Sequence, residues 1–292
     1  MYKYLNRFYR RIGTGICFFL FSFFGAILGY IYFPLVRVFI KDKSARTIHA
    51  QHTINIGFKI FIGIIHHFRI IRFEFEGIEK LYQDRGCIFI ANHPTLIDYV
   101  AIVSKLKLCD NIVKQSLWEN PYYKHVIETA GYIPNINPDQ TFSRLNEIFA
   151  EGRNLLMFPE GTRTSPNQLP KLKRGAAQLA IRTNAPIRMI HISCSPVTLT
   201  KNTKWYNIAE TTPLFRVIVG DKVNPQDFID EADGIPSLAA RWNQMINHIN
   251  ENDPEKVKAF NELIHNEPQA RLDHGITAEM FEYMSKALNN HK

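Results

Sequence analysis

Hydrophobic residues follow two different patterns along the 292-residue chain. Residues 12–36 form an apolar run of 25 positions without a charged side chain, and about 20 such residues suffice to cross a bilayer. A second apolar stretch, residues 54–68, is interrupted by Lys59 and by two histidines at its end. This pattern predicts an N-terminal membrane-anchoring segment made of helices, with the second helix amphipathic or shallowly inserted beside the first.

After the anchor, short apolar runs alternate with segments of helical pattern. Six runs predict strands, at residues 72–76, 87–91, 111–114, 154–158, 187–193 and 215–220. Five segments predict helices, at residues 95–106, 121–130, 139–151, 174–183 and 236–250. The alternation is typical of an α/β domain with a mostly parallel central sheet flanked by helices. The run at 72–76 alternates in polarity, which predicts an edge strand, whereas the continuously apolar runs 87–91 and 154–158 predict central strands.

These patterns divide the chain into membrane-anchoring helices over residues 1–68, an α/β domain over residues 69–250, and a polar helical tail over residues 251–292. The net charge of +8 is unevenly distributed. Residues 1–76 hold 11 Lys/Arg and 3 Asp/Glu, a balance of +8, whereas residues 221–292 hold 7 and 13, a balance of −6. Basic residues concentrated beside apolar sequence favour membrane lipids as partners over nucleic acid.

The basic residues that flank the first apolar run are evenly divided. Four precede it (Lys3, Arg7, Arg10, Arg11) and four follow it (Arg37, Lys41, Lys43, Arg46). Because the number of basic residues is the same on both sides, the positive-inside rule predicts no orientation. The equal numbers also suit a bent segment that enters and leaves the same leaflet, with Pro34 favouring the bend. Spanning and re-entrant arrangements are both compatible with the sequence. We expect the protein at the cytoplasmic face of a membrane, the inner membrane if the protein is bacterial.

The remaining composition gives no sign of a metal or redox cofactor. The four cysteines are widely spaced and form no CxxC pair, which predicts free thiols in a reducing compartment. His66 and His67 are adjacent, and adjacent helical residues point about 100° apart, so they make a poor chelate. No motif for a nucleophilic serine, a zinc protease or a nucleotide-binding glycine loop is present.

The clearest candidate chemistry lies in the stretch ANHPTLIDYV, residues 91–100. His93 directly follows a predicted strand, at the carboxyl end where open α/β sheets bind ligands. Thr95 and Asp98 have the form of a helix capping box, so one interpretation gives Asp98 only a capping role. A side chain in the first helical turn also points back toward the N-terminus. Asp98 can therefore orient His93 as a general base that removes a proton from a substrate hydroxyl.

A second candidate site is FPEGTR, Phe158–Arg163, directly after another apolar strand. Gly161 permits close approach of a ligand to the backbone, and the guanidinium of Arg163 suits a phosphate group. Glu160 would hold Arg163 or an acceptor hydroxyl in place. Taken alone, this turn favours an exposed ion pair on the surface.

NHPTLID and FPEGTR, in this order and about 60 residues apart, together resemble the signature of the glycerolipid acyltransferases, which include the lysophosphatidic acid acyltransferases. The resemblance covers roughly residues 70–220. It implies acyl transfer in phospholipid biosynthesis from an acyl thioester, on coenzyme A or acyl carrier protein, to a lipid hydroxyl, with 1-acylglycerol-3-phosphate as the default acceptor. It also implies a catalytic pair, His93 and Asp98. The implied substrate-binding residues are Asn92, Glu160, Gly161, Thr162, Arg163, Lys173 and Arg174.

The sequence departs from the family pattern between the two motifs. Family members place an arginine after a glycine and an apolar run, whereas here Gly131 is followed by Pro134 and Asn135. Lys173 and Arg174 would supply the missing phosphate contacts or bind the phosphates of the donor. Two alternatives are a membrane module that binds anionic lipids without catalysis, and a thioesterase in which His93 activates water. The sequence does not indicate an oligomeric state.

Overall fold

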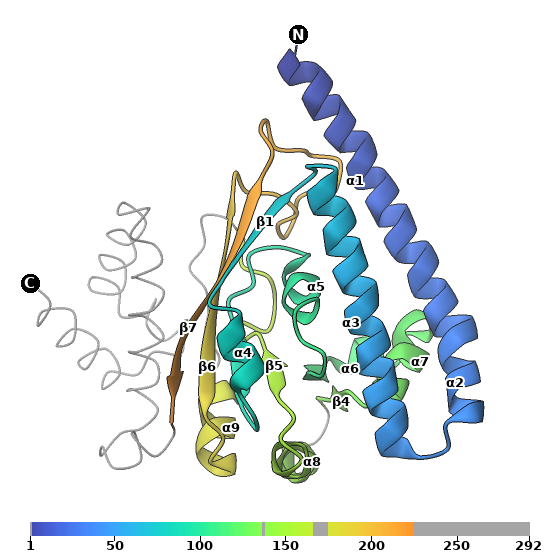
Figure 1. Ribbon diagram of the computed structural model, residues 1–292, viewed down its shortest axis with the longest axis vertical. Coiled ribbons are helices and arrows are strands. Elements are labelled where there is room, and N and C mark those ends of the chain that lie inside the picture. The colour runs from blue at the N-terminus through green and yellow to red at the C-terminus, as the bar shows by residue number, and fades with distance from the viewer. Residues whose placement is uncertain (1, 136–137, 166–174, 225–292) are drawn as a thin grey trace, which may run out of the picture.

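The computed structural model describes residues 2–135, 138–165 and 175–224. Within them, one seven-stranded sheet has the order β1-β7-β6-β2-β5-β3-β4 (Figure 1). Its strands are β1 (Arg72–Glu76), β2 (Ile88–Ala91), β3 (Asp110–Val113), β4 (Ile133–Pro134), β5 (Leu155–Met157), β6 (Ile187–Ser195) and β7 (Leu214–Val223). Five neighbouring pairs are parallel, and only β6 and β7 are antiparallel. The predicted α/β class with a mostly parallel sheet is confirmed.

The sheet order also confirms which runs are central and which lies at an edge. β2 is buried at every position and lies between β6 and β5, whereas β1 is an edge strand with alternating burial. The chain returns after β6 through residues 196–213, which we call the β6–β7 loop, and this return makes β7 antiparallel to β6. The strands β2, β5 and β6 therefore end at the same edge of the sheet as this loop.

Most predicted helices lie within a few residues of their expected bounds. The domain helices are α4 (Glu79–Gln83), α5 (Asp98–Val103), α6 (Gln115–Trp118), α7 (Pro121–Thr129), α8 (Pro138–Ala150) and α9 (Gly175–Thr183). Helix α5 is shorter than the predicted segment 95–106, because the residues before Asp98 form the turn that carries the Asp98 contacts. The predicted helix at 236–250 and the tail at 251–292 lie outside the described residues.

The N-terminal region is a helical hairpin. Helix α1 (Tyr2–Ile27) continues through a π-helical turn, η1 (Leu28–Tyr32), into α2 (Phe33–Phe39), and α3 (Lys43–His67) runs back beside it (Figure 1). The π turn precedes Pro34, which has no N–H to donate and whose ring crowds the carbonyl one turn earlier, so the wider turn relieves the conflict. Among the described residues, the helix over Tyr4–Phe39 is long and apolar enough to cross a membrane.

Helix α3 begins 11 positions before the predicted stretch 54–68, because Asp42 caps it by accepting a hydrogen bond from Ala45 N. The two helices pack through rings, with Phe21 contacting Phe58 and Phe61 at centroid distances of 6.2 and 5.2 Å. The expected packing of the second helix against the first is therefore observed.

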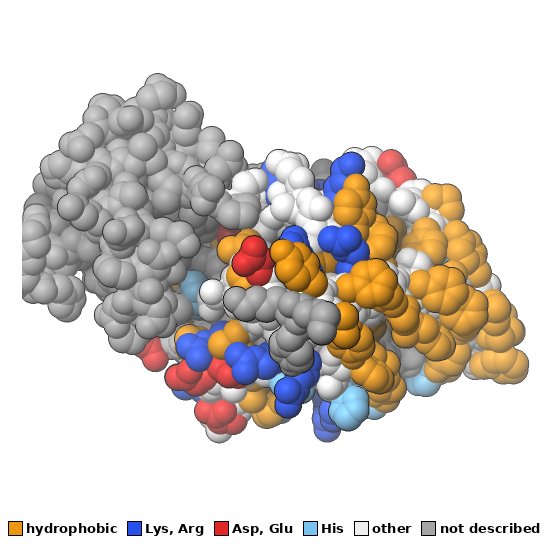
Figure 2. Space-filling view, turned by 90° about the horizontal axis from the view of Figure 1, so that it is seen from above, with side chains coloured by type: hydrophobic (Ala, Val, Ile, Leu, Met, Phe, Trp, Pro, Cys, Tyr) orange, Lys and Arg blue, Asp and Glu red, His pale blue; other side chains and the backbone are white. Residues whose placement is uncertain are grey.

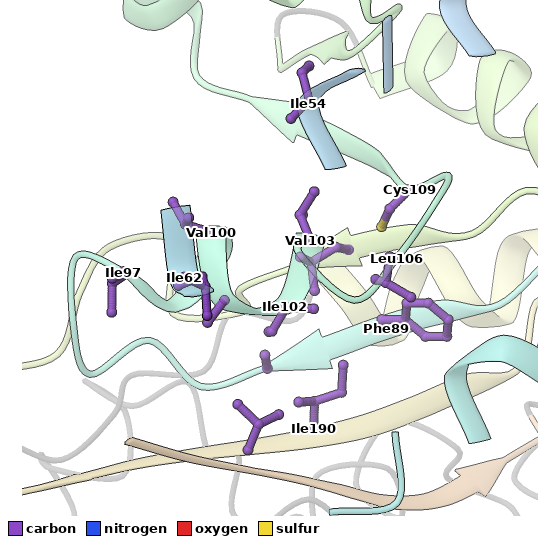
Figure 3. Packing of buried hydrophobic residues seen from close by; sticks show 14 of the residues in the cluster. Ile54, Ile62, Phe89, Ile97, Val100, Ile102, Val103, Leu106, Cys109 and Ile190 are labelled. Atoms are coloured by element: carbon purple, nitrogen blue, oxygen red, sulfur yellow. The ribbon is translucent and has the colours of Figure 1, made fainter. Parts of the chain in front are cut away.

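The hairpin and the sheet share one apolar core. One cluster of buried residues combines Cys17 and Phe33 of the hairpin with Phe89 of β2 and Ile102 of α5. Figure 3 shows Ile54 and Ile62 of α3 close to the side chains of α5, with Phe89 beneath them. A second cluster on the other face of the sheet contains residues of α8 and α9. Helices thus cover both faces, as parallel strands require.

Buried polar contacts also tie α3 to the sheet domain. The side chain of Gln51 donates to Asp110 Oδ1 at 3.1 Å and to Ala130 O at 3.0 Å, and it accepts a hydrogen bond from Cys109 N at 3.0 Å. The Asn55 side chain donates to Val103 O at 2.8 Å. These contacts satisfy polar groups that burial would otherwise leave unpaired.

Candidate active site

The two motifs meet because the strands that precede them are neighbours. β2 and β5 are parallel, with Ile90 opposite Met157. Asn92 and His93 follow β2, and Phe158 to Arg163 follow β5. Parallel strands in register deliver their following residues to the same edge of the sheet, so sequence segments more than 60 residues apart form one site.

His93 and Asp98 are in direct contact. The Nδ1 of His93 lies 2.8 Å from Asp98 Oδ2, and the same carboxylate oxygen accepts a hydrogen bond from Thr95 N at 2.8 Å. The Thr95 hydroxyl donates to Asp98 Oδ1. Asp98 thus makes the predicted capping contacts and the histidine contact at once. Since a carboxylate accepts, the proton of a neutral His93 ring is held on Nδ1, and Nε2 is left as the basic nitrogen.

The environment differs sharply between the two partners. Asp98 is fully buried, whereas 21% of the His93 side chain is exposed. Burial raises the pKa of the Asp98 carboxyl, and the hydrogen bonds from His93 and Thr95 act in the opposite direction. The His93 ring stacks on Phe158, with 4.3 Å between centroids and 28° between planes. The ring is therefore fixed by a carboxylate at one nitrogen and by an aromatic face, while part of it stays accessible.

Glu160 joins the two motifs. Its Oε1 accepts a hydrogen bond from His93 N at 2.8 Å, and its Oε2 accepts one from the Thr164 hydroxyl. The backbone closes the same connection, since Thr164 N donates to His93 O at 3.0 Å. Burial raises the pKa of the Glu160 carboxyl, and the bonds from Thr164 and His93 oppose that rise. The sequence suggested that Glu160 holds Arg163 or an acceptor hydroxyl; in the described part of the chain its partners are the backbone of His93 and the Thr164 hydroxyl.

The turn after β5 presents Gly161, Thr162 and Arg163 beside this connection. Gly161 has a φ of +67°, a backbone conformation that glycine adopts without strain. Thr162 is exposed. The Nη1 of Arg163 donates to the carbonyls of Leu199 and Thr200, each at 3.3 Å. Within the residues that the structure describes, the other two guanidinium nitrogens of Arg163 have no hydrogen-bond partner.

Asn92, predicted to bind substrate, makes contacts within the sheet. The Asn92 amide bridges two strands, donating to Ile192 O at 2.8 Å and accepting from Ile192 N at 2.7 Å. This arrangement gives Asn92 a role in holding β2 and β6 together at the site. Lys173 and Arg174, predicted to bind phosphate, lie outside the described residues.

The contacts of several contributors to the site could not be predicted from the sequence. Phe158 was part of a recognised motif, but its stacking on His93 depends on the neighbouring strands. Thr164 lies one position beyond that motif. The β6–β7 loop reaches the site through Leu199 O, which accepts from both Leu96 N, at 2.9 Å, and Arg163. Only the fold brings these residues together, although the polar and aromatic composition of the loop distinguishes it from its surroundings.

The arrangement can perform proton transfer at a partly exposed imidazole without a nucleophile from the protein. Nε2 can remove a proton from a bound hydroxyl, and Asp98 stabilises the resulting imidazolium. Within the described ranges, no group of three or more His, Cys, Asp or Glu side chains is placed to hold a metal ion. His66, set aside as a metal ligand, accepts a hydrogen bond from Phe73 N at 3.0 Å through its Nδ1.

Residues 72–193, which carry this histidine–carboxylate pair, match the family model described as Acyltransferase, so this part of the chain is similar to that family. The predicted resemblance to the acyltransferases is thereby confirmed over these residues. The curated relatives are 1-acyl-sn-glycerol-3-phosphate acyltransferases. The chloroplast protein of Brassica napus is 27% identical over 120 residues, which is 39% of this chain and 35% of that protein. The beta protein of Homo sapiens is 26% identical over 136 residues, and that of Pseudomonas aeruginosa 24% over 123 residues.

These alignments cover only part of each protein. The alignment with the human protein covers 44% of this chain and 48% of that protein, and the alignment with the Pseudomonas protein covers 40% of this chain and 48% of that protein. The chain thus matches about half or less of the length of these relatives. Among solved structures, the 1-acyl-sn-glycerophosphate acyltransferase of Thermotoga maritima superposes with a TM-score of 0.64 at 19% identity. The superposition covers 83% of this chain and 98% of that one, which establishes the shared fold.

Proposed function

We propose that this protein transfers a fatty acyl group from an acyl thioester, on coenzyme A or acyl carrier protein, to the free hydroxyl of a lysophospholipid at a membrane surface. The default acceptor is 1-acylglycerol-3-phosphate. The observation that carries the proposal is the contact of 2.8 Å between His93 Nδ1 and the buried Asp98, joined through Glu160 to the turn with Arg163. The relatives named as acylglycerophosphate acyltransferases support the same reaction class.

In the proposed reaction, Nε2 of His93 takes the proton of the acceptor hydroxyl while its oxygen attacks the thioester carbonyl. The ester C–O bond forms and the C–S bond breaks. The sulfur leaves as a thiolate and takes a proton from the imidazolium, which restores the neutral ring. General-base assistance of this kind is worth roughly 100- to 10,000-fold in rate, and holding thioester and alcohol together contributes in addition.

Arg163 is the residue that we assign to the acceptor phosphate. Its Nη1 is held by two carbonyls of the β6–β7 loop, so the guanidinium is positioned before any ligand binds. Its remaining nitrogens offer a planar pair of donors, which suits a phosphate. Lys173 and Arg174 are retained as further candidates for phosphates of donor or acceptor. The proposed location is the cytoplasmic face of a membrane, anchored by the hairpin of α1, α2 and α3.

The test is acyl transfer by the purified, lipid-reconstituted protein with an acyl thioester and 1-acylglycerol-3-phosphate. His93→Ala is expected to abolish diacyl product, whereas His67→Ala, at an exposed histidine outside the site, is expected to leave it unchanged. Equal turnover of wild type and His93→Ala would reject the assigned base. Free fatty acid in place of diacyl product would indicate a thioesterase, and the absence of both products with each donor would favour a non-catalytic lipid-binding module.

A further inference from the structure

The β6–β7 loop carries an exposed aromatic and basic surface that the proposed reaction does not use. Trp205 and Tyr206 are 43% and 40% exposed, and their rings lie 5.5 Å apart. Lys204 is exposed, with its Nζ 5.6 Å from the Tyr206 ring, and Lys201 lies on the preceding turn. Tryptophan and tyrosine beside lysine are the residues that proteins place at the boundary between lipid headgroups and acyl chains.

This surface is continuous with the apolar helix α1. The ring of Trp205 packs against Phe18 at a centroid distance of 5.9 Å, and it lies so close to Gly15 that an added Cβ there would approach it to 3.2 Å. Helix α1 exposes Ile12, Ile16 and Phe19 along the same stretch. In Figure 2, apolar side chains gather over the side where α1, α2 and α3 lie, and basic side chains border them.

The first turns of α1 fix the position of the loop. Arg10, which is 1% exposed, donates from Nη2 to Ala209 O at 2.9 Å and to Glu210 O at 2.8 Å. Arg7 donates to Ile208 O at 3.1 Å. The loop therefore cannot shift along the axis of α1 without breaking these three hydrogen bonds. At its other end, the same loop supplies the carbonyls of Leu199 and Thr200 that hold Arg163.

We propose that the β6–β7 loop is a second membrane contact, which seats Trp205 and Tyr206 in the headgroup layer of an anionic bilayer beside α1. The occupant of this surface is the lipid bilayer itself. Its charge suits the loop, whose charged residues are Lys201, Lys204 and Glu210, and Arg7 of α1 adds a further positive charge beside the loop through its bond to Ile208 O. Through Leu199 and Thr200, this contact sets the depth of Arg163 and His93 relative to the membrane surface.

The chain allows a direct test, because its tryptophans are Trp118, Trp205 and Trp242. Trp118→Phe with Trp242→Phe leaves Trp205 as the sole indole, in full-length protein reconstituted into phosphatidylcholine vesicles that contain phosphatidylglycerol. Phospholipids brominated near the headgroup are expected to lower its emission about twofold or more, and aqueous iodide to have little effect. The matched control places the sole indole at the opposite end of the sheet with Tyr82→Trp and Trp205→Phe; iodide should quench it and brominated lipid should not.

Emission from Trp205 that iodide quenches as in the control, without an effect of brominated lipid, would overturn the membrane contact. Lys201→Gln with Lys204→Gln should weaken the bromine quenching, since each lysine near an anionic surface contributes roughly fivefold in affinity. If quenching is unchanged by both this pair and the removal of phosphatidylglycerol, the anionic preference is wrong.

A second readout rests on the proposed function. Trp205→Ala is expected to raise KM for an acceptor presented in the bilayer by about tenfold, and to leave KM for a short-chain, water-soluble acceptor unchanged. Equal effects on both acceptors would assign Trp205 to packing against α1 and reject its membrane role. The two proposals can be rejected independently. Quenching by brominated lipid without acyl transfer would reject the proposed enzymatic function and support the membrane contact. Acyl transfer without quenching would support the enzymatic function and reject the membrane contact.

Discussion

Replacing Asp98 by asparagine removes one negative charge from the site with almost no change in shape. The carboxylate accepts from His93 Nδ1 and Thr95 N through one oxygen, and from the Thr95 hydroxyl through the other. An amide whose oxygen takes the first position keeps both of those bonds, and its NH₂ can donate to the hydroxyl. Asp98→Asn therefore tests the charge of this residue separately from its capping role.

The size of the effect follows from the charge pair that forms when His93 accepts a proton. With about 4 Å between charge centres and an effective dielectric constant of about 20, the interaction is worth about 4 kcal/mol. The proton is only partly transferred in the transition state, so a loss of about 2 to 4 kcal/mol is expected. This loss corresponds to a decrease in kcat of roughly 30- to 1,000-fold.

The assay is the initial rate of thiol release from the acyl thioester, measured in reconstituted vesicles at varied acceptor concentration. Because Asp98 does not contact the acceptor in this mechanism, kcat is expected to fall while KM for the acceptor stays within about threefold. The unfolding midpoint should stay close to that of the wild type. A variant that retains its fold and keeps kcat within about threefold of wild type would refute the assignment of Asp98 as the stabilising carboxylate.

Three further outcomes are expected. Arg163→Ala should raise KM for a phosphate-bearing acceptor about 10- to 100-fold, with Arg163→Lys intermediate, in steady-state kinetics. Asp84→Asn should destabilise the protein by about 3 kcal/mol in denaturant unfolding, because it breaks the buried pair in which Arg188 Nε and Nη2 lie 2.6 and 2.9 Å from the carboxylate. Burial lowers the pKa of His191 to about 4. Its unfolded value is near 6.5, so the unfolded chain binds more protons between these pH values. About 3 kcal/mol should be lost as pH falls through this window, and His191→Leu should remove that loss in thermal melts at pH 4 to 7.

The fold was largely predictable because its strands have strong local signals. Buried strands such as 87–91 are continuously apolar, and the edge strand 72–76 alternates. The site was partly predictable for a related reason. His93 and Arg163 each follow a strand, and the carboxyl ends of parallel strands meet at one edge.

The remaining features depend on contacts between distant segments. Local sequence could not indicate that Glu160 accepts from His93 N instead of binding Arg163, because this choice depends on how two turns face each other. Pro34 indicated a bend in the first helix, but the sequence did not indicate that a π turn at Leu28–Tyr32 would accommodate it. The continuation of α3 back to Lys43 depends on polar residues such as Gln51, whose burial is favourable only through its partners in the sheet domain.

The apolar core that the hairpin shares with the sheet determines how the chain can fold. Cys17, Phe33 and Ile54 lie in the same apolar cluster as Phe89 and Ile102, so residues 1–68 are not a detachable tether. A fragment that starts at residue 69 would present that cluster to solvent and is expected to aggregate instead of yielding a water-soluble enzyme. During synthesis the hairpin emerges from the ribosome before the strands, so the strands complete their folding against these helices.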